Sequence, residues 1–469
     1  MPLPDALRPV AMQRVALVVP DAALRDALVA VADDGTVAFD DMIDGAGGTG
    51  DSVPSAAAGR GAMGRTGPPP ALAAAAPDVG AWQRSGRLDL VAGEASLARR
   101  AERAVVDGRV AALVGWLPAR ALPALAARLR PLGGAAVPLP APPHPGPPTL
   151  LASHGTADGF APLVETYGTV PYEDVDPSLL AGLAYVAMFG MMFADVGHGL
   201  LLVLAACALR WSRWSRLSRL RAAWLFLLGA GVAGTVFGAL YGEFFGPTGV
   251  VPVVWLAPLD HPVPLLLVAV AAGSALLAGA YALGTVNRVR EGGWARALYD
   301  PTGVSGFAVF LGFGVAGAGF ATRLALVVVA GAAAIGVGLT GEFAALWTAA
   351  GGGRGGVLQA AVELFDGVIR LGSNTVSFAR LAAFGLTHAA LCEVVWNATT
   401  GLWHRGPLGA VCAIAIFVIG NALTFALEGL IAAIQALRLE YYELFSRVFV
   451  SEGRPYRPWH IPSIAVEDE

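Results

Sequence analysis

From residue 179 onward the chain consists of apolar runs separated by short polar stretches. A helix needs about 20 apolar residues to cross a bilayer, so these runs predict eight membrane spans. The first two are short and are separated at Asp195-Val-Gly197, which predicts a broken or tightly turned pair. The last two are much longer than a perpendicular span and predict strong tilt or extension beyond the bilayer. The expected spans are 179–194, 197–209, 222–243, 264–286, 303–321, 324–348, 357–400 and 407–446.

The amino-terminal part of the chain follows a different pattern, in which short apolar runs adjoin amphipathic ones. Residues 12–20 and 109–117 predict strands, whereas 97–108 and 118–132 predict helices. A Gly/Ala/Pro-rich stretch predicts a flexible insert at 45–77. We therefore expect a mainly α, polytopic membrane protein with a small α/β domain at 1–137, a linker and pre-membrane segment at 138–178, a transmembrane domain at 179–450 and a tail at 451–469.

Arginine placement predicts the orientation of these spans. The stretch RWSRWSRLSRLR at 210–221 follows the second span, and Arg288, Arg290 and Arg296 follow the fourth. Cytoplasmic loops carry an excess of basic residues, so both loops are expected on the cytoplasmic side. With eight spans the amino and carboxy termini are then cytoplasmic as well, and the loop 244–263, which has no basic residue, faces outside.

Composition strengthens the membrane interpretation. The 469 residues are 56% hydrophobic and 14% charged, with a mean hydropathy of +0.62, which is too apolar for a soluble protein of this size. All 31 basic residues are arginine, and Ala, Gly and Pro are abundant, as a GC-rich bacterial genome would produce. The net charge of −4 is spread along the chain, which argues against nucleic acid as a partner. Residues 1–20 lack the pattern of a signal peptide.

Cofactor and nucleotide motifs are not evident. Cys207, Cys392 and Cys412 lie in apolar runs without CxxC or Cys/His spacing, so we expect buried thiols, no metal site and no cofactor. The glycine-rich stretch GGGRGG at 351–356 lacks the Gly-Lys-Ser/Thr ending of a phosphate-binding loop. This chain is therefore not expected to hydrolyse ATP itself.

The seventh span carries a polar stripe. At 100° per residue, its polar positions fall within about 40° of one face. A charged side chain at bilayer depth costs between about 2.5 and 17 kcal/mol, so it is retained where a carboxylate, a water cavity or an ion path compensates. Snorkelling or an internal ion pair is the structural alternative. The stripe consists of Asp366, Arg370, Ser373, Ser377, Arg380, Phe384 and His388.

The eighth span carries a second polar row, so the two long helices each offer a hydrophilic face. Histidine can titrate near neutral pH, whereas arginine stays charged and can only hold or repel a charge. Such groups are typical of proton paths, and Arg380 would then be a fixed charge rather than a carrier. For Asp195 and His198, at the break between the first two spans, we favour a structural capping role. The second row consists of Asn421, Thr424, Glu428, Gln435 and Arg438.

Several stretches together resemble the membrane-embedded stator subunit of V-type and A-type rotary ATPases, called subunit a or subunit I. They reach from about residue 110 to 460, and their order and spacing agree with that family. The stretches are GWLPARALPALAARL, FAPLVETYGTVPYEDVDPS, MFGMMFADVGHGLLL, SNTVSFARLAAFGLTHAAL and EGLIAAIQALRLEYYELFSRVFVSEGRPYRPW.

The resemblance implies a mechanism and a set of partners. In this family two long tilted helices pack against a rotating proteolipid ring, and a stator arginine makes each ring carboxylate release its proton. Arg380 matches that arginine and Arg438 the second arginine of the last helix. The resemblance further implies peripheral-stalk and central-stalk partners, a location in the cell membrane and two half-channels. The other matching proton-path residues are Glu428, Gln435, His388 and, at an acidic position, Asp366.

Two departures leave alternatives open. The amino-terminal domain is short for the family, which puts its docking to stalk subunits in doubt. Arg370 lies four residues after Asp366 and can neutralise it as an ion pair, in which case Asp366 would not relay protons. A stand-alone secondary transporter or channel, with Arg380 binding a substrate, and a non-conducting remnant of the stator are the competing interpretations of the chain.

Overall fold

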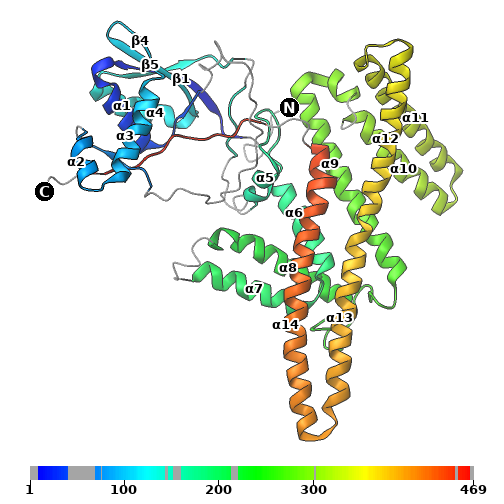
Figure 1. The fold of residues 1–469 in the computed structure, drawn as a ribbon. Coiled ribbons are helices and arrows are strands. Elements are labelled where there is room, and N and C mark those ends of the chain that lie inside the picture. The colour runs from blue at the N-terminus through cyan, green and yellow to red at the C-terminus, as the bar shows by residue number, and fades with distance from the viewer. Residues whose placement is uncertain are drawn as a thin grey trace. The chain divides into compact units, whose positions relative to one another are not determined.

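The computed structural model describes residues 9–40, 69–74, 77–142, 146–151, 160–212, 220–299, 303–448 and 453–464. The chain divides into two compact units (Figure 1). The first, an α/β unit, comprises Met1–Ala152, Gly168–Tyr172 and Glu452–Glu469. The second, a helical unit, comprises Ser153–Tyr167 and Glu173–Ser451. The Gly/Ala/Pro-rich insert expected at 45–77 lies mostly outside the described residues.

The α/β unit is built on an antiparallel sheet in the order β2-β5-β1-β6, with β4 also pairing with β5. The central strand β1 alternates apolar side chains toward the core, where Val15, Leu17 and Val19 are buried. Burial of one face fixes the register of its neighbours, because a one-residue slip would expose these side chains. The strands are β1 (Met12–Pro20), β2 (Ala38–Phe39), β4 (Val105–Asp107), β5 (Val110–Pro118) and β6 (Ala135–Leu139).

Four helices accompany this sheet: α1 (Leu24–Asp34), α2 (Val79–Arg84), α3 (Leu88–Ala101) and α4 (Leu122–Leu129). The helix expected over 97–108 is wrong in its second half, because α3 ends at Ala101 and the chain enters β4. Gly108, with φ +61°, provides the tight turn that pairs β4 with β5, a conformation that glycine adopts without strain.

The carboxy-terminal segment is part of the α/β unit. Its strand β7 (Ser463–Ile464) pairs in parallel with β3 (Leu72–Ala73), which lies in the described part of the expected flexible insert. The Ile461 amide donates to the Ala32 carbonyl at 3.1 Å. Ser463 donates from both its amide and its hydroxyl to Asp33, and the hydroxyl bond lowers the pKa of that carboxyl. The segment expected to be a tail is thus anchored through the first helix.

The helical unit follows the apolar runs closely. Six of its described helical stretches are long and apolar enough to cross a membrane. The other two expected spans form helices of 15 and 16 residues, about 23 Å long, which is shorter than the roughly 30 Å hydrocarbon layer. The helices are α5 (Ala161–Tyr167), α6 (Ser178–Met192), α7 (Val196–Trp211), α8 (Trp224–Tyr241), α9 (Pro262–Tyr299), α10 (Val304–Thr322), α11 (Ala325–Ala349), α12 (Gly353–Ser377), α13 (Ala379–Trp403) and α14 (Gly406–Leu439).

The break expected between the first two spans is confirmed. Helix α6 ends at Met192, and Asp195 caps α7 by accepting a hydrogen bond from the His198 amide at 2.8 Å. Helix α8 packs closely against this region through glycines. A Cβ atom on Gly238 would collide with the backbone of Asp195 and Val196, so only glycine fits at this contact.

The arginines that predicted the orientation are only partly described. Arg213, Arg216 and Arg219 lie outside the described residues, while Arg210 and Arg221 are included. Arg288, expected in a loop, is instead fully buried within α9, because the helix continues past its apolar run as far as a kink at Gly293, where φ is +74°.

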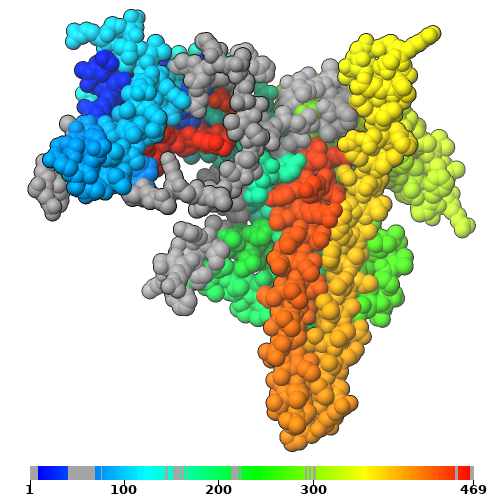
Figure 2. Space-filling view, viewed as in Figure 1, coloured from blue at the N-terminus to red at the C-terminus, as the bar shows by residue number. Residues whose placement is uncertain are grey.

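The two long carboxy-terminal stretches lie side by side, as Figure 2 shows. One runs through α12 and α13 for 51 residues, and the other runs from α14 to Val448 for 43 residues. The latter ends in a π-helical turn (Glu440–Phe445) and a short helix α15 (Ser446–Val448). At about 65 Å, the second stretch is twice the thickness of the hydrocarbon layer.

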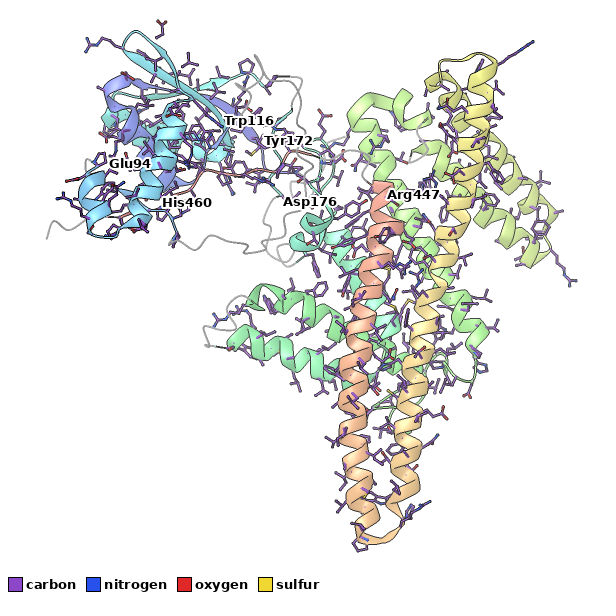
Figure 3. All side chains as sticks on the ribbon, in the orientation of Figure 1. Glu94, Trp116, Tyr172, Asp176, Arg447 and His460 are labelled. Atoms are coloured by element: carbon purple, nitrogen blue, oxygen red, sulfur yellow. The ribbon has the colours of Figure 1, made fainter. Side chains whose placement is uncertain are left out.

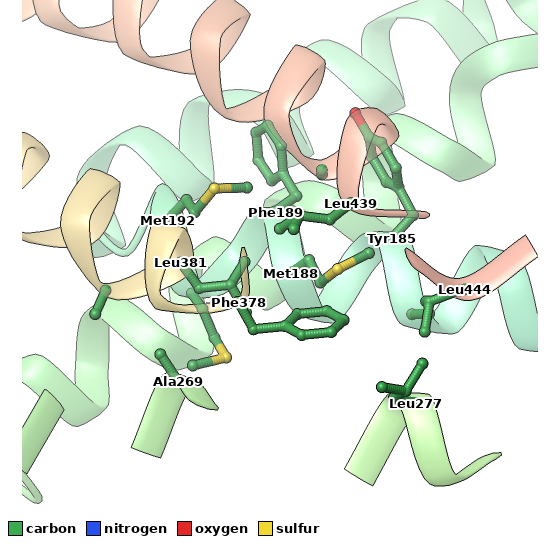
Figure 4. Close-up of a cluster of buried hydrophobic side chains, with 14 of the residues drawn as sticks. Tyr185, Met188, Phe189, Met192, Ala269, Leu277, Phe378, Leu381, Leu439 and Leu444 are labelled. Carbon is green, nitrogen blue, oxygen red and sulfur yellow. The ribbon is translucent and has the colours of Figure 1, made fainter. Parts of the chain in front are cut away.

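A buried apolar cluster joins these long helices to α6 and α9 (Figure 4). It brings Tyr185 and Met188 of α6 against Phe378, at the junction of α12 and α13, and Leu439 of α14. All four side chains are at most 1% exposed, so truncating any of them would leave a cavity. This packing fixes the polar groups that flank Phe378.

Candidate functional site

The polar site begins at the junction between α12 and α13. Phe378 forms a one-residue interruption there, and its ring packs on Gly273 of α9, where a Cβ atom would collide with it. Ser377 and Arg380 lie on either side of this buried anchor. The Arg380 Nη2 atom donates to Ser377 Oγ at 3.0 Å.

A buried carboxyl group from the other long stretch completes the site. Ser377 Oγ donates to Glu443 Oε1, and the charges of both Arg380 and Arg438 act on this carboxyl. Glu443 is 6% exposed and lies in the π-helical turn. Two arginines from α13 and α14 therefore converge on one acidic side chain.

Glu443 was not predicted as a site residue, although it lies in one of the stretches that resemble the rotary ATPase family. Glu443 follows Arg438 by five residues, a spacing that points about 140° away on a regular α-helix. The π-helical turn widens the helix by one residue per turn and rotates Glu443 out of that register. The available signal was the acidic pair Glu440 and Glu443 at the end of an apolar helix.

Arg380 and Gln435 keep unused hydrogen-bonding capacity. The Arg380 Nη1 donor and the Gln435 Oε1 acceptor are buried, and neither finds a partner among the described residues. Arg380 and Gln435 are half-buried as whole residues, and Arg438 is exposed. Among the described residues, the guanidinium of Arg380 therefore retains one donor that has no acceptor.

A third arginine, Arg447 of α15 (labelled in Figure 3), holds the segment that carries Glu443. Its guanidinium lies 5.4 Å from the centroid of the Tyr281 ring of α9. Its Nη2 atom donates to the Asn374 amide oxygen of α12 at 3.2 Å. These contacts connect the end of the last helix to two neighbouring helices.

Asp366 is not brought to Arg380. The two residues are 14 positions apart, roughly 20 Å along the helix axis. Asp366 instead forms an ion pair with Arg370, and the two side chains are 54% and 69% exposed. The structure thus contains the Asp366–Arg370 ion pair that the sequence analysis gave as one alternative.

The second polar row divides into a buried and an accessible half. Asn421, Thr424 and Glu428 of α14 are buried, at 7%, 6% and 5% exposure. The Asn421 amide donates to the Phe417 carbonyl of its own helix at 2.9 Å. Gln435 and Arg438 lie farther along α14, and the charge of Arg438 acts on Glu443. The row therefore passes from the helical core toward the arginine site.

His388 belongs to a separate buried cluster with Asp195, His198 and Cys392. Their side-chain nitrogen, oxygen and sulfur atoms all lie within 4.8 Å of one another. All four residues are at most 1% exposed. Cys392 is thus a buried thiol as expected, whereas Cys207 is only half-buried, and Cys412 is exposed because its side of α14 is not covered by the described chain.

The chain matches known proteins over these regions. The profile of the V-type ATPase 116kDa subunit family matches residues 105–245 and 358–461, which include every candidate residue described above. The A-type ATP synthase subunit I of Aeropyrum pernix is 27% identical over 357 residues, covering 66% of this chain and 50% of that protein.

Two further relatives carry the same description. The A-type ATP synthase subunit I of Halobacterium salinarum is 27% identical over 380 residues, covering 67% of this chain and 51% of that protein. The A-type ATP synthase subunit I of Saccharolobus solfataricus is 40% identical over 101 residues, covering 20% of this chain and 14% of that protein. The chain spans about half the length of the first two relatives that it matches.

Proposed function

The chain belongs to the V-type ATPase 116kDa subunit family, and from that premise we propose that it is the proton-translocating stator subunit of a rotary V/A-type ATPase. It spans the cell membrane eight times, with α6 and α7 as the two short spans, and both termini are cytoplasmic. Its partners are a proteolipid ring and the peripheral-stalk and central-stalk subunits.

The convergence of Arg380 and Arg438 on the buried carboxyl group of Glu443 carries this proposal. A ring carboxylate that moves through lipid stays protonated, because an isolated charge is costly there. A guanidinium within roughly 4 to 6 Å favours its anionic form. The buried, unpartnered Nη1 donor of Arg380 is suited to that encounter. Rotation past Arg380 then couples proton release to movement of the ring.

Ser377 and Glu443 are the positioning residues in this account. Glu443 lies close enough to act on both arginines, and Ser377 bridges it to Arg380. A buried acidic partner keeps the guanidinium in place while the ring moves. Because arginine stays protonated, Arg380 also prevents protons from passing directly between the two half-channels.

The half-channels are lined by polar residues on either side of Arg380. Glu428 and His388, which are buried within the helical unit, belong to one. Asp366, on α12, belongs to the other, and Gln435, three residues before Arg438 on α14, belongs to the same proton path. Because Asp366 forms an ion pair with Arg370, Asp366 makes this second half-channel hydrophilic and does not carry protons itself.

Purification under mild detergent tests the proposal against a stand-alone transporter. We expect the full chain to co-purify with a small ring-forming proteolipid and with ATPase subunits, and the preparation to pump protons in vesicles when ATP is added. A chain that is solitary and transports a solute unaided would refute the proposal. A complex that assembles and hydrolyses ATP without moving protons would identify a non-conducting remnant instead.

A further inference from the structure

A set of metal-binding side chains meets where the break between α6 and α7 contacts α13. Asp195 and His198 come from the break and the first turn of α7, and His388 and Cys392 lie four residues apart on one face of α13. We propose that these four side chains bind a transition-metal ion of the zinc class. Histidine, cysteine and carboxylate are the ligands that Zn²⁺ takes in proteins.

The histidine nitrogens of the cluster make no well-formed hydrogen bond to groups outside it within the described chain. Both ring nitrogens of His198 and the Nδ1 atom of His388 are buried and unpaired within the described chain. Asn421 is near enough to His198 to interact with its ring, although neither the Asn421 Oδ1 atom nor a His198 ring nitrogen reaches the full geometry of a hydrogen bond. Buried side-chain nitrogens are nearly always paired in native proteins, so three unpaired ones that share a site point to a missing ligand.

The spacing of the ligand atoms suits a tetrahedral ion. Metal–nitrogen and metal–sulfur bonds of about 2.0 and 2.3 Å place neighbouring ligand atoms about 3.3 to 3.8 Å apart. Asp195 Oδ1 lies 3.7 Å from His198 Nδ1, and His388 Nε2 lies 3.8 Å from Cys392 Sγ. All remaining ligand pairs are within 4.8 Å. Contraction by about 1 Å, which side-chain rotation can provide, completes the coordination sphere.

Charge also favours a divalent ion. The Asp195 carboxylate and the Cys392 thiolate together balance two positive charges, so the loaded site is neutral in an apolar interior. The thiol proton is released to solvent as the sulfur binds the metal.

The shell around the cluster orients the ligands and excludes water. Each carboxylate oxygen of Asp195 accepts one backbone hydrogen bond, from His198 at 2.8 Å and from Gly246 at 2.9 Å, and keeps a lone pair for a metal. Aromatic rings of Phe193 and Phe245 lie 5.0 to 5.2 Å from the two histidine rings. With four protein ligands the site is closed and therefore structural, joining the helix break to α13.

Metal uptake by the full-length chain in detergent tests this inference. After removal of metals with a chelator, the protein is titrated with Zn²⁺ or with Co²⁺ as a spectroscopic probe. We expect one ion per chain by elemental analysis, a higher melting temperature with Zn²⁺, and a thiolate-to-Co²⁺ charge-transfer band with the ligand-field absorption of a tetrahedral site.

Cysteine variants provide the specific comparison. Cys392→Ser removes the only thiolate of the cluster and should abolish the charge-transfer band, whereas Cys412→Ser, on the exposed face of α14, should keep it. Circular dichroism of each metal-free variant checks that it folds. Failure of the wild-type chain to take up the ion would overturn the proposal. So would a charge-transfer band that survives in Cys392→Ser, or the loss of that band in Cys412→Ser.

Metal binding also has a consequence that rests on the proposed function. A bound ion occupies His388 and removes it from the half-channel, so the assembled ATPase should transport protons more slowly when loaded with Zn²⁺ than after chelation. Cys412→Ser should show the same difference as the wild type. Metal uptake is measured on the purified chain itself. The Zn²⁺ and Co²⁺ titrations therefore remain valid even if the assembled complex does not transport protons. Equal transport rates with and without Zn²⁺ would refute the regulatory part alone.

Discussion

At the residue scale, Arg380 is held from one side. Its Nη2 atom binds Ser377, which in turn binds Glu443, while Nη1 has no partner in the described part of the chain. A guanidinium fixed by one edge presents the other edge in a defined direction, as planar recognition of a carboxylate requires. The proposed proton transfer therefore depends on Ser377 as well as on Arg380.

Replacement of Ser377 by alanine should weaken proton pumping without abolishing it. The variant removes the bridge between Arg380 and Glu443, and loss of a hydrogen bond worth about 1 kcal/mol corresponds to roughly a fivefold lower rate. ATP-driven proton uptake into vesicles measures this effect. Ser85→Ala is the matched control, because the Ser85 hydroxyl donates to the Ala81 carbonyl of α2 in the α/β unit, 2.9 Å away. Equal rates for Ser377→Ala and the wild type would show that Ser377 does not position the arginine.

At the element scale, close helix packing sets the position of the break that carries Asp195. Helices α7 and α8 approach through glycines, and Gly199, Gly231 and Gly238 all face backbone atoms of the opposite helix or of its cap. Small residues at such contacts are typical of membrane helices, which associate by close packing rather than by hydrophobic exclusion. The positions of the cap, the break and the adjoining His198 therefore depend on glycines that allow the two helices to approach closely.

Gly238→Ala should destabilise the chain by about 1 to 3 kcal/mol, because the added methyl group collides with the backbone of Asp195 and Val196. A lower melting temperature in detergent checks this prediction. Gly314→Ala on α10 is the matched control, since its Cβ atom would meet nothing within 4 Å, and alanine improves helix propensity. An unchanged melting temperature for Gly238→Ala would contradict the close packing.

The elements themselves were largely predictable, because apolar runs of span length and a helix-breaking Asp-Val-Gly sequence leave few alternatives in the helical unit. The errors arose where pairing rather than periodicity decides structure. Strand β4 forms because Gly108 closes a hairpin with β5, although the preceding residues continue a helical pattern. Strand β7 is too short to have a period, and only its pairing with β3 defines it.

The site was predictable only where the helix is regular. Spacing of 3.6 residues predicted that Arg380, Glu428 and Arg438 lie on polar helix faces, and all three residues lie in α-helices. Glu443 was missed because a π-helical turn shifts its direction. The meeting of Cys392 with Asp195 was likewise inaccessible, since the two are nearly 200 positions apart and have no motif spacing.

At the scale of the whole molecule, the two long stretches and the α/β unit have different tasks. The α/β unit gathers its own carboxy-terminal segment through β7 and Asp33, independently of the polar site. The helical unit holds both arginines, the buried acid and the histidine cluster. Under the proposed function, proton transfer belongs to the helical unit, and attachment to the stalk subunits belongs to the α/β unit.

The central claim is that Arg380 itself unloads the ring carboxylate, and ATP-driven proton uptake by vesicles containing the complex with Arg380→Lys tests it most directly. Lysine keeps the charge but lacks the planar fork and can give up its proton when desolvated, so uptake should fall to the background level. Arg405→Lys, in the exposed turn between α13 and α14, should pump at the wild-type rate. Full proton uptake by Arg380→Lys would contradict the account.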